Sequence, residues 1–350
     1  MYMRRKTRSV KVGNLEIGGN APISVQSMTN TDTMNITDTV AQIKRMEKEG
    51  CELVRVAVPD LESCYSLPLI KKEINIPIVA DIHYDYKLAL KSIELGVDGL
   101  RLNPGNITNY EKVKLVIKSA KKMNIPIRFG INSGSLDKNI LKIHKKVTPE
   151  ALIESAEKVI KVLEEVDYHN IIFSIKSTNI INTIEANNLF SSKYDYPLHI
   201  GITEAGPPFS GIIKSSVGIG SLLFQGIGDT IRVSLTGDPV EEIKVGYEIL
   251  KALHLRQRGP NIISCPTCGR CKVNLKNIVT KLEKKISHSN KTLTIAVMGC
   301  MVNGPGEARE ADIGVAFDKN YGVLFKKGKI IAKYSDKIII RRLLEEIKDE

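Results

Sequence analysis

Short runs of β-branched and other apolar residues alternate with amphipathic segments along the first 255 residues of the chain. Such alternation is typical of parallel strands joined by helices, so it indicates an α/β fold. Eight runs are the number that closes a TIM-type (β/α)8 barrel, although periodicity alone leaves an open doubly wound sheet as an alternative. The predicted strands are Ile23–Met28, Leu53–Val58, Ile76–His83, Gly99–Asn103, Ile125–Asn132, Ile171–Lys176, Leu198–Glu204 and Thr230–Leu235.

Two of the connecting segments carry clear helix signals. Apolar residues recur at helical spacing from Ile36 to Met46, and the pattern stops at Gly50. A second helix is expected to begin after Thr148, a suitable N-cap, with Pro149 at its first position. These helices are expected to cover the outside of the sheet.

A polar segment at Arg256–Asn261 breaks the preceding helix and is predicted to be a linker. It separates a barrel domain, residues 1–255, from a second domain, residues 262–350. The second domain is expected to be a small α+β unit. Its predicted elements are a helix at about 274–285, strands at 293–298 and 313–317, a hairpin at 322–334 and a closing helix at about 335–347.

The composition, with 42% hydrophobic and 26% charged residues, is that of an ordinary globular protein. No stretch is apolar enough to cross a bilayer or to serve as a signal peptide, so we expect a cytoplasmic protein without a membrane partner. The net charge of +12 is compatible with an anionic partner, and both nucleic acid and phosphorylated metabolites satisfy that condition. Much of the excess charge is expected to be solvated lysine on helix surfaces.

Four of the six cysteines lie in the second domain. Cys265 and Cys268 form a C-x-x-C pair, and Cys300 follows a predicted strand and precedes a glycine-rich turn that ends at Glu307. Thiolates in this arrangement suit an iron–sulfur cluster, with Glu307 as the candidate fourth ligand of a three-cysteine cluster. A closed zinc site that also uses Cys271 is the alternative. The remaining cysteines, Cys51 and Cys64, are expected to be inert buried thiols.

Polar side chains at a spacing of two interrupt the apolar barrel strands near their carboxyl ends. The side chains at such positions point the same way, and the chemistry of a (β/α)8 barrel takes place at this end. Because most of the charges are positive and arginine suits phosphate oxygens, the ring predicts a diphosphate-like ligand, although Asp81 and Arg101 alone would also make a simple salt bridge. The candidate residues are Arg55, Asp81, His83, Arg101, Asn103, Arg128, Asn132, Lys176, Glu204, Arg232 and Ser234.

Four longer motifs resemble one enzyme family, the 4-hydroxy-3-methylbut-2-enyl diphosphate synthases of the non-mevalonate isoprenoid pathway. They are VQSMTNT at 25–31, GIGDTIRVSLTGDP at 226–239, SCPTCGR at 264–270 and MGCMVNGPGEA at 298–308. The resemblance extends over nearly the whole chain. It implies a barrel followed by a reductase-like domain with a [4Fe-4S] cluster, and a two-electron reductive ring opening of 2-C-methyl-D-erythritol 2,4-cyclodiphosphate.

The resemblance also implies roles and partners. Cys265, Cys268 and Cys300 would be cluster ligands and Glu307 the fourth ligand, whereas Cys271 lies outside the pattern. Glu204 would be the acid–base residue, which together with Glu307 makes up the expected catalytic set. Flavodoxin or ferredoxin would donate electrons, and a head-to-tail homodimer would place the cluster of one chain over the barrel of the other.

Two other classes make different predictions. A zinc-stapled nucleic-acid-binding protein would need aromatic side chains among its basic residues, but the chain has no Trp and only 5% aromatic residues. We therefore expect no nucleic-acid partner. A pterin- or phosphosugar-binding barrel with a structural metal would stay active after the metal is lost.

Overall fold

The computed structural model describes residues 4–106, 110–286, 289, 291–301, 306 and 309–349. The chain divides into two compact units, Met1–Arg256 and Gln257–Glu350. Each unit has its own apolar core. They are described separately.

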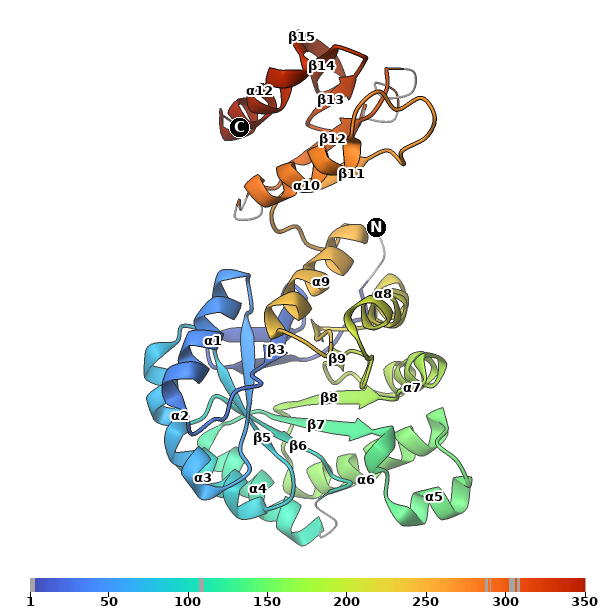
Figure 1. Ribbon diagram of the computed structural model, residues 1–350. Coiled ribbons are helices and arrows are strands. Elements are labelled where there is room, and N and C mark those ends of the chain that lie inside the picture. The colour runs from blue at the N-terminus through green and yellow to red at the C-terminus, as the bar shows by residue number, and fades with distance from the viewer. Residues whose placement is uncertain are drawn as a thin grey trace. The chain divides into compact units, whose positions relative to one another are not determined.

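The first unit is a parallel barrel, as predicted (Figure 1). Its eight-stranded sheet has the order β8-β7-β6-β5-β4-β3-β10-β9. The ring closes between its two ends, where a parallel bridge joins Phe173 to Leu198 and the Phe173 N–H donates to the Pro197 carbonyl at 3.0 Å. The strands are β3 (Ser24–Met28), β4 (Leu53–Ala57), β5 (Ile78–Ile82), β6 (Gly99–Leu102), β7 (Ile127–Asn132), β8 (Ile171–Lys176), β9 (His199–Ile200) and β10 (Thr230–Ile231).

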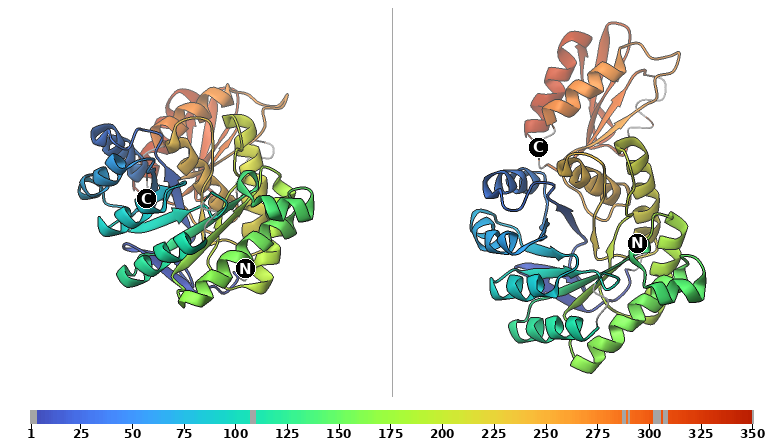
Figure 2. Two further views of the ribbon diagram at one scale, coloured as in Figure 1. Left: turned by 90° about the horizontal axis from the view of Figure 1, so that it is seen from below. Right: turned by 60° about the horizontal axis from the view of Figure 1, so that its bottom comes forward.

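The helices of this unit surround the strands, as the views in Figures 1 and 2 show. Both helix predictions are confirmed: Val40, Ile43 and Met46 are buried, and the Thr148 hydroxyl accepts a hydrogen bond from the Ala151 N–H at 3.2 Å. The helices are α1 (Ile36–Lys48), α2 (Leu61–Glu73), α3 (Tyr86–Glu94), α4 (Tyr110–Met123), α5 (Lys138–His144), α6 (Pro149–Val166), α7 (Ile180–Lys193), α8 (Pro208–Phe224) and α9 (Pro239–Ala252), with a 3-10 turn at Ser133–Ser135.

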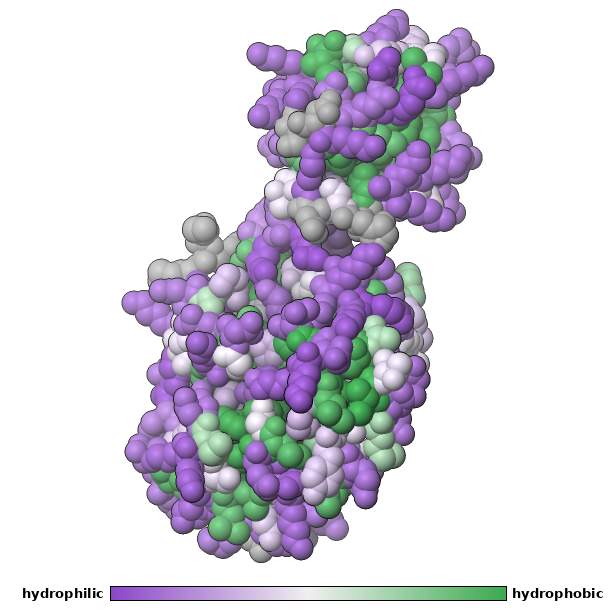
Figure 3. All heavy atoms as spheres, turned by 90° about the vertical axis from the view of Figure 1, so that its left-hand side faces the viewer, coloured by the Kyte–Doolittle hydropathy of each residue, from purple (hydrophilic) through white to green (hydrophobic). Residues whose placement is uncertain are grey.

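The outer surface of the barrel is mostly hydrophilic on the side that Figure 3 shows. Figure 3 shows the side of the barrel on which α1, α2 and α3 lie, and hydrophilic side chains cover most of it, with apolar patches between them. Leu61, Tyr65 and Leu69 of α2 are large apolar side chains that remain exposed. In the described part of the chain, no helix combines the length and the apolar character that crossing a bilayer requires.

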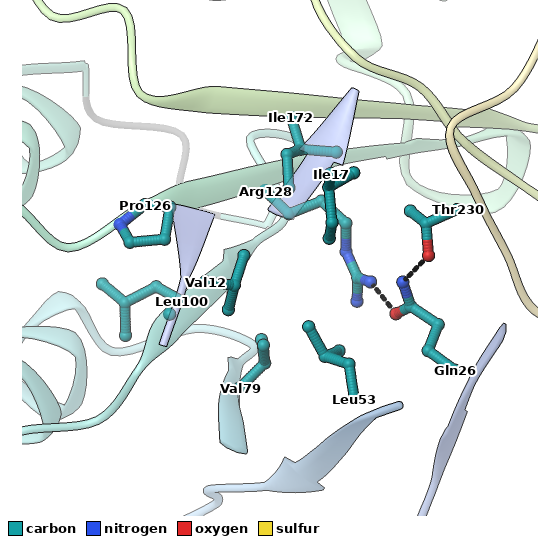
Figure 4. Close-up of a pocket in the computed structure, with 11 residues that line it drawn as sticks. Val12, Ile17, Gln26, Leu53, Val79, Leu100, Pro126, Arg128, Ile172 and Thr230 are labelled. Carbon is teal, nitrogen blue, oxygen red and sulfur yellow. Dashed lines mark hydrogen bonds between the residues drawn. The ribbon is translucent and has the colours of Figure 1, made fainter. Parts of the chain in front are cut away.

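An antiparallel hairpin that was not predicted closes the amino-terminal end of the barrel. It consists of β1 (Ser9–Val12) and β2 (Leu15–Gly18), and it turns at Gly13, which has a φ of +58°. Val12 and Ile17 pack against residues at the beginnings of barrel strands (Figure 4). The hairpin therefore covers the amino-terminal end of the barrel with apolar side chains.

The second unit is a small α+β domain built on a five-stranded sheet with the order β11-β12-β13-β14-β15. The first three strands are parallel, and the last two pair antiparallel. The strand at Asn261–Ser264 was not predicted, and it begins inside the segment interpreted as a linker. The elements are β11 (Asn261–Ser264), α10 (Leu275–Ile286), β12 (Thr294–Met298), β13 (Ile313–Phe317), β14 (Tyr321–Lys326), β15 (Lys329–Ser335) and α12 (Asp336–Asp349).

Candidate functional site

A polar cavity lies at the carboxyl ends of the barrel strands. Seven of the predicted site residues line it: Arg55, Arg101, Arg128, Asn132, Lys176, Arg232 and Ser234. They come from strands β4, β6, β7 and β8 and from the segment directly after β10. Parallel strands end at the same edge, so barrel closure brings these distant positions together.

Two buried carboxylates neutralise part of this charge. Asp81 of β5 lies 3.2 Å from the Arg55 guanidinium and 3.0 Å from that of Arg101. Glu242 of α9 lies 3.3 Å from Arg232. The salt bridge between Asp81 and Arg101, considered as an alternative from the sequence, is therefore present. The Asp81 carboxylate holds the guanidinium groups of Arg55 and Arg101 in place, and its oxygens already pair with them.

Lys176 and Arg128 have no carboxylate partner among the described residues. Arg128 donates from Nη1 to the Gln26 side-chain oxygen at 2.5 Å, and Gln26 in turn donates to Thr230 at 2.7 Å (Figure 4). The second nitrogen, Nη2, is buried and has no hydrogen-bond partner in the described part of the chain. Burial, reinforced by the neighbouring cations, holds the pKa values of Arg128 and Lys176 well below their usual range. Buried cations without counterions indicate a site for an anion.

Sequence reasoning missed four residues that also line the cavity: Gly130, Ser174, His199 and Thr203. The Ser174 hydroxyl lies 2.9 Å from Nδ1 of His199, and both side chains are buried. The rule that found the other positions would have found Ser174, because it precedes Lys176 by two residues on the same strand.

Two other predicted residues, Asn103 and His83, have other surroundings. Asn103 donates to the Ser135 hydroxyl at 2.7 Å and accepts from the Gly105 N–H at 3.0 Å, so it shapes a loop and does not line the cavity. His83 is 41% exposed and lies 3.9 Å from Asp81.

Glu204 was predicted to end a strand, and this is wrong because β9 stops at Ile200. Glu204 is exposed in the loop that follows, one residue after the cavity-lining Thr203, with a left-handed φ of +52°. The loop is fixed by the Thr236 N–H, which donates to the Gly206 carbonyl at 3.1 Å. Few non-glycine residues adopt this conformation, so the surrounding loop holds the backbone of Glu204 in it.

An Asp81→Asn variant is expected to be less stable by about 3 kcal/mol at neutral pH, because Arg55 and Arg101 would lose their buried counterion. Burial alone would raise the pKa of Asp81, but Arg55 and then Arg101 lower it to about 2. As pH falls, Asp81 therefore becomes protonated at a higher pH in the unfolded chain than in the folded one. Its contribution to the free energy of unfolding is lost as pH falls from about 4 through about 2. Urea unfolding at several pH values would measure both effects.

The matched control is Asp195→Asn, which removes an exposed carboxylate paired with Arg8 and is expected to cost at most about 1 kcal/mol. Equal losses in the two variants would contradict the role assigned to Asp81.

The cysteines of the second unit lie in loops after two adjacent parallel strands. Cys265, Cys268 and Cys271 follow β11, and Cys300 follows β12. Two hydrogen bonds join the loops: the Gly299 N–H donates to Cys265 Sγ at 3.2 Å, and the Lys272 N–H donates to the Gly299 carbonyl at 2.9 Å. The thiols are only partly buried or exposed, and none of the six cysteines forms a disulfide.

The donor set fits a soft metal centre, because thiols from two loops are combined with a backbone N–H directed at sulfur. Within the described ranges, no three Cys, His, Asp or Glu side chains already form a ligand group. Glu307, the expected fourth ligand, lies outside the described residues. Cys51 and Cys64 are buried in the barrel unit, as predicted.

Comparison with known proteins extends these observations. The GcpE TIM-barrel domain model matches residues 7–247, and the GcpE protein C-terminal domain model matches residues 261–349. A 4-hydroxy-3-methylbut-2-en-1-yl diphosphate synthase (flavodoxin) of Caldanaerobacter subterraneus subsp. tengcongensis is 57% identical over 346 residues, which cover 99% of this chain and 98% of that protein. The protein with the same name from Clostridium tetani is 56% identical and covers 99% of each chain.

Among solved structures, a dihydropteroate synthetase with bound product is similar with a TM-score of 0.50 and 11% identity, covering 72% of this chain and 100% of that one. This similarity concerns the fold alone. The two domain models together span nearly the whole sequence, and the relatives match it over almost their full length. The chain belongs to the GcpE family.

Proposed function

We propose that this chain catalyses the reductive ring opening of 2-C-methyl-D-erythritol 2,4-cyclodiphosphate to 4-hydroxy-3-methylbut-2-enyl diphosphate. The reaction consumes two electrons and two protons and releases one water. The observation that carries the proposal is the cavity at the barrel mouth, in which five cations face only two buried carboxylates in the described part of the chain. The names of relatives at 57% and 56% identity support the same substrate.

The cations have distinct tasks in this proposal. Arg55, Arg101 and Arg232 are positioned by Asp81 and Glu242, so their orientation is set before a ligand arrives. Lys176 and Nη2 of Arg128, which has no hydrogen-bond partner in the described part of the chain, would donate to the diphosphate oxygens. Such preorganised charges bind the diphosphate and stabilise the negative charge that forms as the C–O bond breaks.

The second unit would hold a [4Fe-4S] cluster through Cys265, Cys268 and Cys300, with Glu307 as the fourth ligand. Such a cluster, when bound, supplies single electrons and a Lewis-acidic iron. The Gly299 N–H already donates to the Cys265 sulfur, an interaction that tunes the potential of clusters in proteins. Glu204 would deliver a proton to the oxygen that leaves as water.

Flavodoxin is the proposed electron donor, because the relatives carry it in their names, and ferredoxin is the alternative. We further propose a cytoplasmic homodimer. The cytoplasm would keep the cysteine thiols reduced, in accord with the absence of disulfides among the six cysteines. Sedimentation analysis of the protein with its metal would test the dimer.

The decisive experiment is purification without oxygen, followed by the visible spectrum, iron and sulfide content, and turnover of the cyclodiphosphate with dithionite or reduced flavodoxin. A brown protein that bleaches with dithionite and releases the linear diphosphate is expected. A colourless protein with one zinc per chain, unchanged after reconstitution with iron and sulfide, would refute the proposal.

A Lys176→Met variant is expected to bind inorganic pyrophosphate about ten- to a hundred-fold more weakly, because one charged donor is lost. The same change should stabilise the fold, since it removes a buried ammonium without a counterion. Titration calorimetry and urea unfolding measure the two effects.

The pH dependence of stability provides a second reading of Lys176. Burial, with the neighbouring arginines, lowers its pKa, so the unfolded chain binds this proton more tightly. The free energy of unfolding of the wild type should therefore rise with pH between the lowered pKa of Lys176 in the folded state and about 10.4, the pKa of lysine in the unfolded chain. This rise should be absent in Lys176→Met. Lys44→Met, which replaces an exposed lysine of α1, is the control, and equal pyrophosphate affinities for Lys176→Met and wild type would contradict the assignment.

A further inference from the structure

His199 and Ser174 form a buried polar pair at the place where the barrel closes. Ser174 follows Phe173 on β8, and His199 follows Leu198 as the first residue of β9, so both lie next to the closing bridge between Phe173 and Leu198. The imidazole is 1% exposed, and its Nδ1 is 2.9 Å from the Ser174 hydroxyl. Its other nitrogen, Nε2, is buried without a hydrogen-bond partner in the described part of the chain, although His199 lines the cationic cavity. A buried polar atom without a partner requires an explanation.

The charges around the ring determine its ionisation. Lys176, Arg128, Arg55 and Arg232 act on it, and together with burial they hold its pKa well below the usual histidine range. A neutral imidazole has one N–H donor and one acceptor. If the Ser174 hydroxyl donates to Nδ1, the ring proton resides on Nε2. The Nε2–H group is then a free donor of a residue that lines the cavity.

We infer that His199 is a ligand-binding residue, whose Nε2–H donates a hydrogen bond to an oxygen of the diphosphate and whose tautomer Ser174 selects. The inference deepens the proposed function and rests on it. A neutral donor next to five cations adds a directed hydrogen bond to the anion without adding a further buried charge. Ser174 is a positioning residue, because it acts through the ring.

Two substitutions separate this role from a purely structural one. His199→Gln places an amide nitrogen near the position of Nε2 and gives up the contact with Ser174. His199→Asn keeps a partner for Ser174 near the position of Nδ1 and removes the donor to the cavity. Binding of inorganic pyrophosphate to the full chain is measured by calorimetry, with thermal unfolding as the check that each variant is folded.

We expect His199→Asn to bind pyrophosphate about ten-fold more weakly than wild type, and His199→Gln to stay within about three-fold of it. His169→Gln, which alters an exposed histidine of the same unit, should bind like wild type. If the contact between Ser174 and His199 has only a structural role, His199→Gln should have a lower unfolding temperature than His199→Asn, and the two variants should bind pyrophosphate with equal affinity. That result would overturn the inference.

A second readout is independent of affinity. In ¹⁵N spectra of the histidine rings, His199 is expected to show the Nε2–H tautomer and no titration between pH 6 and 8, and Ser174→Ala should disturb that pattern. A ring that carries its proton on Nδ1, or a wild-type chain that does not bind pyrophosphate, would also overturn the inference. Turnover of the cyclodiphosphate by the wild-type enzyme would still support the proposed function in either case.

Discussion

A Cys300→Ala variant is expected to purify without a cluster and to show no turnover of the cyclodiphosphate. Cys300 follows β12, and the adjacent Gly299 is hydrogen-bonded both to Cys265 and to the loop after β11. Removing this thiol leaves two of the three proposed cysteine ligands, which cannot complete a cubane cluster. Iron content should fall from about four per chain to near zero, as measured by iron and sulfide analysis after anaerobic reconstitution.

Two other cysteines serve as controls for this experiment. Cys64→Ala changes a thiol that is buried beside Ser92 in the barrel unit, and it should keep its iron. Cys271→Ala separates the two metal hypotheses. Cys271 Sγ donates to the Val273 carbonyl at 3.2 Å, so the thiol has a partner within the protein. Iron loss in Cys271→Ala as severe as in Cys300→Ala would refute the ligand set proposed here and favour a four-cysteine site.

A Glu204→Gln variant is expected to lower turnover by about 10²- to 10⁴-fold, the usual contribution of a general acid. The amide occupies the same space and permits the same backbone conformation, but it cannot transfer a proton. Because the carboxylate acts on the breaking bond, the affinity for pyrophosphate should change by less than about three-fold. Steady-state kinetics and calorimetry separate the two quantities.

Asp167→Asn is the matched control for Glu204. Asp167 is likewise an exposed acidic residue of the barrel unit with a positive φ, 53° against 52° for Glu204, but it ends α6 and pairs with Lys121. Its turnover should equal that of wild type. Full turnover in Glu204→Gln would remove Glu204 from the mechanism, whereas equal losses in both variants would indicate a general effect of altered loop carboxylates.

The strands were predictable because their signal is local. Each apolar run of the barrel lies where a strand formed. The predicted ends of β4, β5 and β6 were one residue too late, and those of β9 and β10 were four residues too late. Beyond Ile200 and Ile231 the chain keeps apolar residues but leaves the sheet to form loops at the barrel mouth. The β1–β2 hairpin was not predicted, although Val10, Val12, Leu15 and Ile17 alternate with polar residues around a Gly-Asn turn, which is a hairpin signal. Its strands are only four residues long, and they pack against Leu53, Val79 and Ile172. The strand at Asn261–Ser264 is similarly short.

The amino-acid sequence by itself determined the barrel, the small second domain, the cysteine loops and the positions of most cavity residues. Strands and helices are recognised by side chains that recur every two or about four residues, and this recurrence follows from the local backbone geometry. Only the tertiary structure decided which cations have partners: Asp81 and Glu242 pair with three arginines, and Lys176 lacks a carboxylate among the described residues. It also placed Glu204 in a loop and joined Ser174 to His199. These contacts join residues far apart in the chain, and their geometry arises only when the ring of strands closes and fixes the direction of every side chain.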